Sequence, residues 1–245
     1  MKYTLVATAS WSGSFAFCSR GHGFLIETHD PRCNLDSDFS AWNDSMPTQT
    51  RQRLIDAAVR RFYRDGFRNV GIDQILSDVG ISKTAFYKHF ECKEDLMLAA
   101  LEMQNQWLQN TFREMIRDRG GASALGQLRA VMDVVETIIQ NDDFQGCIFV
   151  NVAMEFPLQH EPAHVAAAES KRAIEALIRE IAVQAGAADP GALAQEMCLI
   201  IEGAYVTRQV TGNRQIADIA RRIAERTIAT HVPGGFSPCE PALFS

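Results

Sequence analysis

The chain has 245 residues, of which 47% are hydrophobic and 22% are charged, a composition typical of a globular protein with one large or two small domains. Its formal net charge of −6 at first argues against a nucleic-acid partner. No apolar run is long enough to span a membrane. The six cysteines form no CxxC pair and no metal-ligand spacing, which indicates a reduced, cytoplasmic protein without a bound metal or cofactor.

Residues 1–45 differ from the rest of the chain. After Lys2, the segment LVATASWSGSFAF has the outline of a signal peptide, but Ser, Thr and Gly interrupt its apolar part. Two interpretations are open: the segment reflects an upstream start-site assignment, with Met46 as the working initiator, or it is a weakly ordered arm. On either interpretation we expect this irregular extension to be dispensable.

A first helix is predicted at residues 48–65. Arg side chains cover much of its surface, whereas one face is apolar, as expected for a helix that packs on one side. The apolar positions are Leu54, Ile55, Ala58, Val59 and Phe62. Gly66 follows as a C-terminal cap, so the helix should end there.

Residues 70–90 predict two short helices joined by a turn. The apolar residues Ile72, Ile75, Leu76 and Val79 recur at helical spacing, and Gly80 ends this helix. Ser82 offers a side-chain oxygen to the free amides of a second helix at 83–90. Two short helices about a glycine-containing turn form a helix-turn-helix, although a plain helical hairpin is the alternative.

The second helix of this motif has a face that suits DNA. Phe86 and Phe90 would point inward, which leaves cations, a hydroxyl and an aromatic ring for phosphates and base edges. The predicted DNA-binding residues on this helix are Lys83, Thr84, Tyr87, Lys88 and His89. The charge distribution agrees, since residues 46–100 carry a net charge of +2, residues 1–45 carry −2 and the remainder carries −6.

The rest of the chain predicts further helices and no convincing strand. A long helix at 93–118 begins at Lys93, whose charge adds to the positive end of the helix dipole and predicts a phosphate contact. Further helices are expected at 122–140, 146–156, 161–184, 191–210 and 213–231, followed by a tail at 233–245. The total is about nine helices, so the predicted fold class is all-α.

The run from Thr50 to Glu102 resembles the DNA-binding domain of TetR-family transcriptional regulators. The residues that carry the resemblance are Ile55, Ala57, Ala58, Phe62, Gly66, Phe67, Ile75, Gly80, Ile81, Ser82, Phe86, Tyr87, His89, Phe90, Lys93, Glu94 and Leu96. Gly71 and Leu76 depart from the family pattern, which usually has Ser or Thr and Ala at these positions. The resemblance implies a three-helix DNA-binding domain at 46–92 and a helical ligand-binding and dimerisation domain at 93–232.

The predicted helix at 191–210 has apolar residues on nearly every side, which one adjoining core does not explain, and the final helix carries an apolar stripe. With the family resemblance, this favours a homodimer built on a two-fold four-helix interface. The expected interface residues are Met197, Ile200, Ala204, Ile216, Ala220, Ile223 and Thr227. An ordinary intramolecular core is the alternative.

The second domain also offers soft apolar side chains with a few polar tips, as small-molecule cavities do. The predicted ligand-binding residues are Met103, Trp107, Phe112, Met132, Glu136, Asn151, Met154 and Tyr205. Glu136 and Glu155 lie on apolar stretches and need a partner, either a cationic ligand or a protein donor. Cys147, at a helix start, is either a sensor of electrophiles or an inert buried thiol. Core packing is the alternative for each of these residues.

No nucleophile motif, phosphate-binding loop or paired metal ligands occur, so the chain is predicted not to be an enzyme. The leading hypothesis is a ligand-responsive transcriptional regulator, most simply a repressor. Its expected partners are a pseudo-palindromic double-stranded DNA operator, a small-molecule effector and a second copy of the chain, with no membrane. The alternative is a helical ligand-binding or scaffold protein with a vestigial helix-turn-helix.

Overall fold

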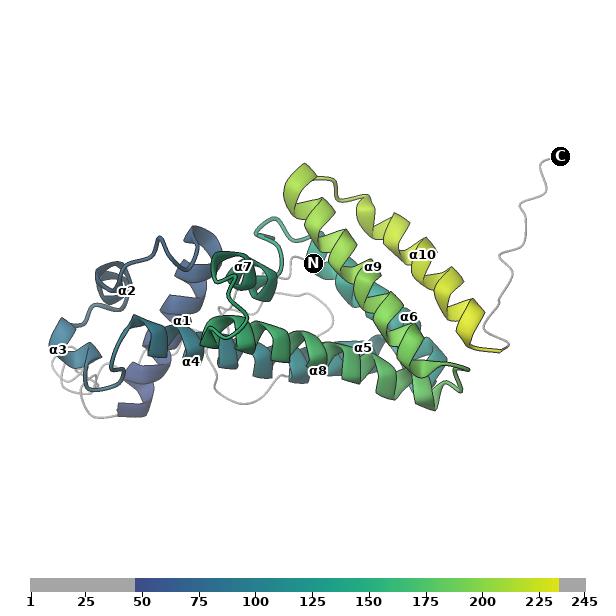
Figure 1. The fold of residues 1–245 in the computed structure, drawn as a ribbon, viewed down its shortest axis with the longest axis horizontal. Helices are drawn as coiled ribbons and strands as arrows, with labels where there is room; N and C mark the ends of the chain where they lie inside the picture. The colour runs from purple at the N-terminus through teal and green to yellow at the C-terminus, as the bar shows by residue number, and fades with distance from the viewer. Residues whose placement is uncertain (1–46, 234–245) are drawn as a thin grey trace, which may run out of the picture.

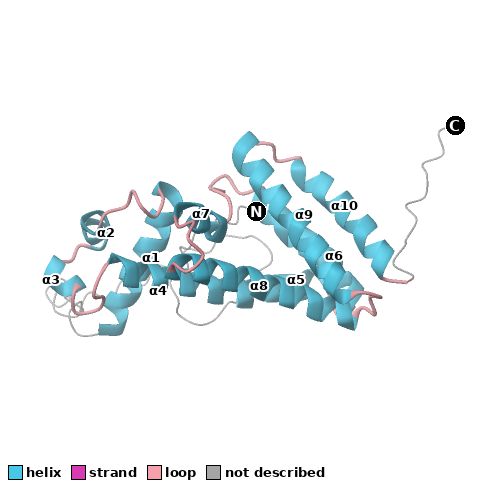
Figure 2. Cartoon of the chain, in the orientation of Figure 1, coloured by secondary structure: helices cyan, strands magenta, loops and turns pink. Residues whose placement is uncertain are grey.

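The computed structural model describes residues 47–233, and this part of the chain is built from helices without a strand (Figures 1 and 2). In chain order they are α1 (Pro47–Asp65), α2 (Ile72–Val79), α3 (Lys83–Phe86), α4 (Lys93–Trp107), the π-helical turn η1 (Leu108–Phe112), α5 (Arg113–Gly120), α6 (Ala124–Ile139), α7 (Ile148–Glu155), α8 (Pro162–Gln184), α9 (Pro190–Thr211) and α10 (Ile216–His231). Because α4, η1 and α5 form one unbroken helical run, residues 47–233 contain nine helical segments, as the sequence predicts.

Two bounds differ from the prediction for a physical reason. The second helix of the motif ends at Phe86 rather than Phe90, because the next amides bond three residues back: Lys88 N donates to Ala85 O and His89 N to Phe86 O. The predicted helix at 93–118 continues to Gly120 but widens into a π turn at Leu108–Phe112. The predictions for residues 1–45 and for the tail beyond residue 233 lie outside the described residues.

The described helices enclose two apolar cores. One core lies at the end formed by α1–α3, and the other lies among η1, α5, α6, α8, α9 and α10. The first core also contains the start of α4, together with Phe149 and Val152 of α7 and Ala163 and Ala167 of α8. The predicted DNA-binding end, formed by α1–α3 and the start of α4, therefore shares buried side chains with helices of the second predicted domain.

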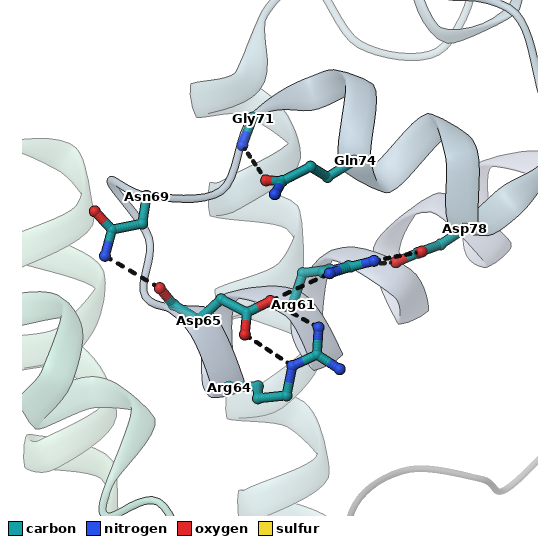
Figure 3. A network of polar contacts seen from close by, with 7 residues as sticks. All are labelled: Arg61, Arg64, Asp65, Asn69, Gly71, Gln74 and Asp78. Carbon is teal, nitrogen blue, oxygen red and sulfur yellow. Dashed lines mark hydrogen bonds and ion pairs between the residues drawn. The ribbon is translucent and has the colours of Figure 1, made fainter.

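An ion-pair network fixes α2 against α1 (Figure 3). Arg61 of α1 makes two hydrogen bonds to the carboxylate of Asp78 on α2, at 2.5 and 2.6 Å, and a third to Asp65 at 3.3 Å. The hydrogen bonds from Arg64 and Arg61 outweigh partial desolvation and lower the pKa of Asp65 to about 2. The hydrogen bond from Arg61 likewise lowers the pKa of Asp78. The angle between α1 and α2 is thus held by charge as well as by the core.

The start of α2 is capped without a Ser or Thr. Gly71 occupies the N-cap position, and its N–H donates to Gln74 Oε1 at 2.8 Å (Figure 3). Asn69, in the preceding turn, donates to the backbone oxygen of Asp65 at 3.3 Å. Gln74 therefore satisfies one amide at the start of α2, so this helix is capped although Gly71 departs from the family pattern.

None of the helices within residues 47–233 combines the length and the apolar character needed to cross a lipid bilayer.

Candidate DNA-binding surface and ligand cavity

The turn between α2 and α3 has the geometry that its sequence predicts. Gly80 adopts a left-handed conformation (φ +73°), and the N–H groups of Gly80 and Ile81 both donate to Leu76 O, at 2.8 and 3.2 Å. Ser82 Oγ then accepts a hydrogen bond from Ala85 N at 3.2 Å and starts α3. These caps set α3 across the end of α2.

Burial of two phenylalanines decides which side of α3 faces outward. Phe86 is fully buried and Phe90 nearly so, and their ring centroids lie 5.8 Å apart. The four predicted DNA-binding residues Lys83, Thr84, Tyr87 and Lys88 are consequently exposed, whereas His89 is half-buried. Lys83 lies 3.5 Å from Asp73 of α2, while Lys88 has no ion pair with any residue in 47–233.

The sixth predicted DNA-binding residue, Lys93, points elsewhere in this conformation. Its ammonium lies 3.4 Å from the backbone oxygen of Arg68 and 5.9 Å from the centroid of the Phe62 ring. Burial lowers its pKa, against the opposing charges of Glu94 and Glu155. Contact between Lys93 and a phosphate stays a prediction, and it requires the side chain to turn away from the α1–α2 turn.

A cavity of about 160 Å³ lies between the two cores. Its wall comes from α1, the ends of α4 and α6, η1, the loop between α6 and α7, the start of α7, and α8 and α9. The lining residues are Val59, Arg60, Tyr63, Gln104, Trp107, Leu108, Phe112, Ile138, Asn141, Asp143, Phe144, Gly146, Cys147, Ile148, Phe149, Lys171, Ile174, Ile201, Glu202 and Tyr205. A helix of the DNA-binding end therefore borders the cavity directly.

A polar cluster interrupts the apolar wall. Lys171 Nζ on α8 donates to Cys147 Sγ at 3.1 Å and forms a close ion pair with Glu202 of α9. Burial lowers the pKa of Lys171, but the charges of Cys147 and Glu202 and the hydrogen bonds to them outweigh burial, so its pKa is raised and it stays an ammonium. The Tyr205 phenol also lines the cavity, and burial raises its pKa well above the usual value.

Tyr63 joins α1 to the cavity rim. Its hydroxyl donates to Gly146 O at 3.0 Å and accepts from Gln145 N at 2.8 Å. Burial raises the pKa of Tyr63 to about 12, although the hydrogen bond from Gln145 opposes this. The sequence did not lead us to predict three cavity residues, Tyr63, Lys171 and Glu202. For Lys171 and Glu202 a signal was available, because each is a charged residue on an apolar helix face.

Three of the predicted ligand-binding residues lie on the cavity wall, namely Trp107, Phe112 and Tyr205. Met132 does not, because it is 2% exposed within the helical core around α6. Met154 is 77% exposed on α7 and does not line the cavity either. Helical periodicity identified these as apolar positions but not which neighbour each one meets.

The other three predicted ligand-binding residues are also absent from the cavity wall. Glu136 forms an ion pair with Arg221 of α10. Asn151 donates to Gln145 O at 3.0 Å and accepts from Gln209 at 3.1 Å. Met103 packs against the core of the DNA-binding end, where its sulfur accepts a hydrogen bond from Gln52. Each of these side chains is occupied by a protein partner.

The predicted dimer residues divide between the inside and the surface of the second core. Met197, Ala204 and Ala220 are buried within this chain, as the intramolecular alternative would have them. Ile200, Ile216 and Thr227 are half-buried, and Ile223 is 45% exposed. The register of α9 turns a different apolar stripe outward: Leu199, Gly203, Val206 and Val210.

Comparison with known proteins gives two family matches that together span more than half of the chain. Residues 54–100 match the model "Bacterial regulatory proteins, tetR family", and residues 124–224 match "Tetracyclin repressor-like, C-terminal domain". The HTH-type transcriptional regulator YjdC of Escherichia coli is 22% identical over 175 residues, which cover 71% of this chain and 91% of YjdC. A match to the HTH-type transcriptional regulator YerO of Bacillus subtilis is 37% identical over 73 residues but covers only 30% of this chain and 25% of YerO.

Solved structures share the architecture. The crystal structure of SCO4454, a TetR-family transcriptional regulator from Streptomyces coelicolor, superimposes with a TM-score of 0.68 at 26% identity. This superposition covers 75% of the present chain and 96% of SCO4454.

Proposed function

The chain belongs to the TetR family of transcriptional regulators, which are DNA-binding proteins and not enzymes, and from this premise we propose that it is a cytoplasmic repressor released from DNA by a small molecule. As a homodimer, it would bind a pseudo-palindromic operator. The observation that carries the proposal is the exposed face of α3, which bears Lys83, Thr84, Tyr87 and Lys88. The cavity is bordered by α1, which belongs to the same DNA-binding end. Operator affinity and cavity occupancy would therefore share structural elements.

The proposed DNA contact uses the exposed side of α3. Lys88 would meet a phosphate, while Thr84 and Lys83 would meet base edges and set the preferred sequence. Two copies of α3 must lie about 34–36 Å apart to enter successive major grooves of B-DNA. Two-fold symmetry of the operator would follow from two-fold symmetry of the protein.

Replacing Lys88 by Ala tests this contact. We expect operator affinity to fall roughly tenfold per subunit, about 1.4 kcal/mol, in every sequence context. The slope of log K against log salt should shrink by about 0.9 per subunit, because one phosphate contact is lost. Fluorescence anisotropy on a labelled fragment of the chain's own upstream DNA measures both quantities.

Arg113→Ala is the matched control for Lys88→Ala, since Arg113 pairs with Glu180 far from α3 and should leave the salt slope unchanged. Lys93→Ala should reduce the slope by less than Lys88→Ala does, because its ammonium is engaged at the α1–α2 turn. If the wild-type protein binds no DNA from its own upstream region, the vestigial helix-turn-helix alternative is favoured instead.

The proposed dimer uses the outward stripe of α9, formed by Leu199, Gly203, Val206 and Val210, with Ile219 and Ile223 of α10 beside it. Leu199 is 73% exposed, Val206 is 45% exposed and Val210 is 78% exposed, so large apolar side chains face outward along about three turns of one helix. Gly203 lets a partner helix approach closely, and no atom lies within 4 Å of the position its Cβ would take. A second copy of the same stripe is the occupant that family membership supports.

Val206→Arg is expected to convert the dimer to monomer. A charge placed at the middle of the stripe would be buried without a partner, which should weaken association roughly hundredfold, about 2.7 kcal/mol. Light scattering coupled to size-exclusion chromatography measures the mass. Met154→Arg introduces the same charge at an exposed apolar position of α7 and should leave the dimer intact. A Val206→Arg protein that remains dimeric would assign the interface to another face.

A small molecule in the cavity would act by binding the DNA-free conformation more tightly than the DNA-bound one. Trp107, at the end of α4, and Tyr63, on α1, both line the cavity. Their helices carry the DNA-binding end, so a ligand that displaces either ring would alter the position of α3. This gives the cavity two routes to the DNA, through α4 and through α1.

A further inference from the structure

The inner part of the cavity wall carries two opposite charges that are already paired. Lys171 of α8 and Glu202 of α9 are half-buried and form an ion pair with each other. Because each neutralises the other, this part of the wall presents no net charge, and a charged group placed there would have to compete with the pair. The part of a ligand that enters the cavity should therefore be uncharged.

Aromatic side chains surround the interior of the cavity. The aromatic lining residues are Tyr63, Trp107, Phe112, Phe144, Phe149 and Tyr205. The rings of Phe144 and Tyr205 meet edge to face with their centroids 5.5 Å apart, an arrangement that aromatic pairs prefer. The cavity measures about 160 Å³, and an apolar cavity of about 150 Å³ holds one benzene molecule in another protein. The interior therefore fits a single aromatic ring.

The mouth of the cavity is marked by two residues of opposite charge. Among the lining residues, all of which lie within residues 47–233, only Arg60 of α1 and Asp143 of the loop between α6 and α7 are exposed. Neither side chain makes an ion pair or a hydrogen bond with another residue in 47–233. The cavity thus offers a cation and an anion at its opening, and both are free to bind a ligand.

Arg60 and Asp143 lie on the two sides of one junction. Tyr63 follows Arg60 by about one turn of α1, and its hydroxyl bonds to Gly146 O and Gln145 N of the loop that carries Asp143. Burial is the main reason why the pKa of Tyr63 is raised, and the charge of Asp143 adds to it, so this carboxylate lies near the junction. One small head group can therefore meet both charges.

We propose that the cavity takes a zwitterionic α-amino acid with a single aromatic ring, whose carboxylate binds Arg60 and whose ammonium binds Asp143. This inference rests on the proposed function, since it names the ligand class of the same cavity. A guanidinium binds a carboxylate through two parallel hydrogen bonds, and an ammonium donates to a carboxylate through charge-assisted ones. The ring occupies the aromatic interior, beside the neutral pair of Lys171 and Glu202.

A ligand bound in this way connects α1 to the loop between α6 and α7. Arg60 is adjacent to Arg61, whose hydrogen bonds to Asp78 hold α2 against α1. An occupant that draws Arg60 toward the loop therefore acts on the helix that orients α2 and, through it, α3.

Isothermal titration calorimetry of the full-length protein with L-phenylalanine at neutral pH tests the ligand class. Two analogues each lack one charge: 3-phenylpropanoate has no ammonium, and 2-phenylethylamine has no carboxylate. We expect each analogue to bind roughly tenfold more weakly than L-phenylalanine, because one charge-assisted contact is lost.

Two variants assign the charges to their residues. In Arg60→Gln, L-phenylalanine and 2-phenylethylamine should bind equally, since the carboxylate has lost its partner, whereas Arg60→Lys should keep part of the difference. In Asp143→Asn, L-phenylalanine and 3-phenylpropanoate should bind equally. Arg117→Gln and Asp218→Asn make the same changes at exposed residues outside the cavity wall and should leave all affinities unchanged.

Equal affinity of the wild-type protein for L-phenylalanine and either analogue would overturn the proposal, as would discrimination that does not depend on Arg60 and Asp143. Absence of saturable binding by both L-phenylalanine and L-tyrosine would overturn it too. Calorimetry requires no DNA, so these outcomes differ from failure of the proposed function, which would appear as absent operator binding by the ligand-free protein. Binding of L-phenylalanine without any change in operator affinity would overturn its role as an effector.

Discussion

Replacing Phe86 by Ala should abolish operator binding and lower the free energy of unfolding by about 3–5 kcal/mol. Phe86 is fully buried and belongs to the core formed by α1–α4. It is the last residue of α3, a helix of four residues that makes too few hydrogen bonds of its own to persist without packing. Anisotropy on labelled operator measures the loss of binding, and thermal unfolding measures the loss of stability.

Tyr87→Ala is the matched variant on the adjacent residue. Tyr87 is 53% exposed, and its ring meets Phe86 only edge to face at 5.3 Å. We expect its loss to weaken operator binding while the melting temperature changes little, since exposed substitutions usually stay within about 0.5 kcal/mol. Phe86→Leu should keep most of the stability by filling part of the space. A stable Phe86→Ala protein with normal operator affinity would contradict this account of how α3 is held.

The DNA-binding end was predictable because its signals are local. Gly80 and Ser82 each encode a cap within a few residues of chain, and both caps are present in the structure. The alternation of buried Phe86 with exposed Tyr87 follows from the same short-range spacing. The extent of α3 was not predictable, since i→i+3 bonds after Phe86 compete closely with continuation of the helix.

The cavity was predicted only in part, because its wall is assembled from six α-helices, the π turn η1 and a loop. Trp107 and Phe112 belong to the helix that the sequence singled out, whereas Tyr63 comes from α1 and Lys171 from α8. Apolar spacing tells which side of a helix is buried but not against which helix it lies. Met132 illustrates this, since the same spacing that suggested a ligand contact places it in the α6 core.

The outward face of α9 shows the same limit. Apolar residues occur around the whole helix, so the sequence indicates burial on two sides without saying which residues serve which side. The register, visible only in the fold, turns Met197 and Ala204 inward and leaves Leu199 and Val206 outside.

The sequence left the partner of Glu155 open. In the structure its carboxylate accepts hydrogen bonds from the DNA-binding end of the chain. Oε1 accepts a hydrogen bond from Phe67 N at 2.9 Å and Oε2 one from Arg68 N at 2.7 Å. Arg68 completes the contact, as its Nε donates to Glu155 O at 2.8 Å and its guanidinium stacks over Phe156 at 4.8 Å. The partner is therefore a protein donor, and the carboxylate fastens the end of α7 to the turn between α1 and α2.

Glu155→Ala should lower the free energy of unfolding by about 1.5–3 kcal/mol, because two backbone amides lose a charged acceptor. Each kcal/mol corresponds to roughly 2–4 °C in melting temperature for a chain of this size. Glu169→Ala is the control, since Glu169 is exposed on α8 and should change the melting temperature little. A Glu155→Ala protein as stable as the control would show that solvent replaces the carboxylate without loss.

The same variant should uncouple the cavity from DNA. Helix α7 begins immediately after Cys147 at the cavity wall and ends at Glu155, and its eight residues span about 12 Å. A rigid segment fixed at both ends transmits displacement, whereas one released at Glu155 does not. With α4 and α1 as the remaining routes, we expect Glu155→Ala to retain operator binding at low temperature but to lose a large part of the release caused by a small molecule in the cavity. Full release in Glu155→Ala, measured by anisotropy at matched occupancy of the cavity, would assign the coupling to α4 and α1 instead.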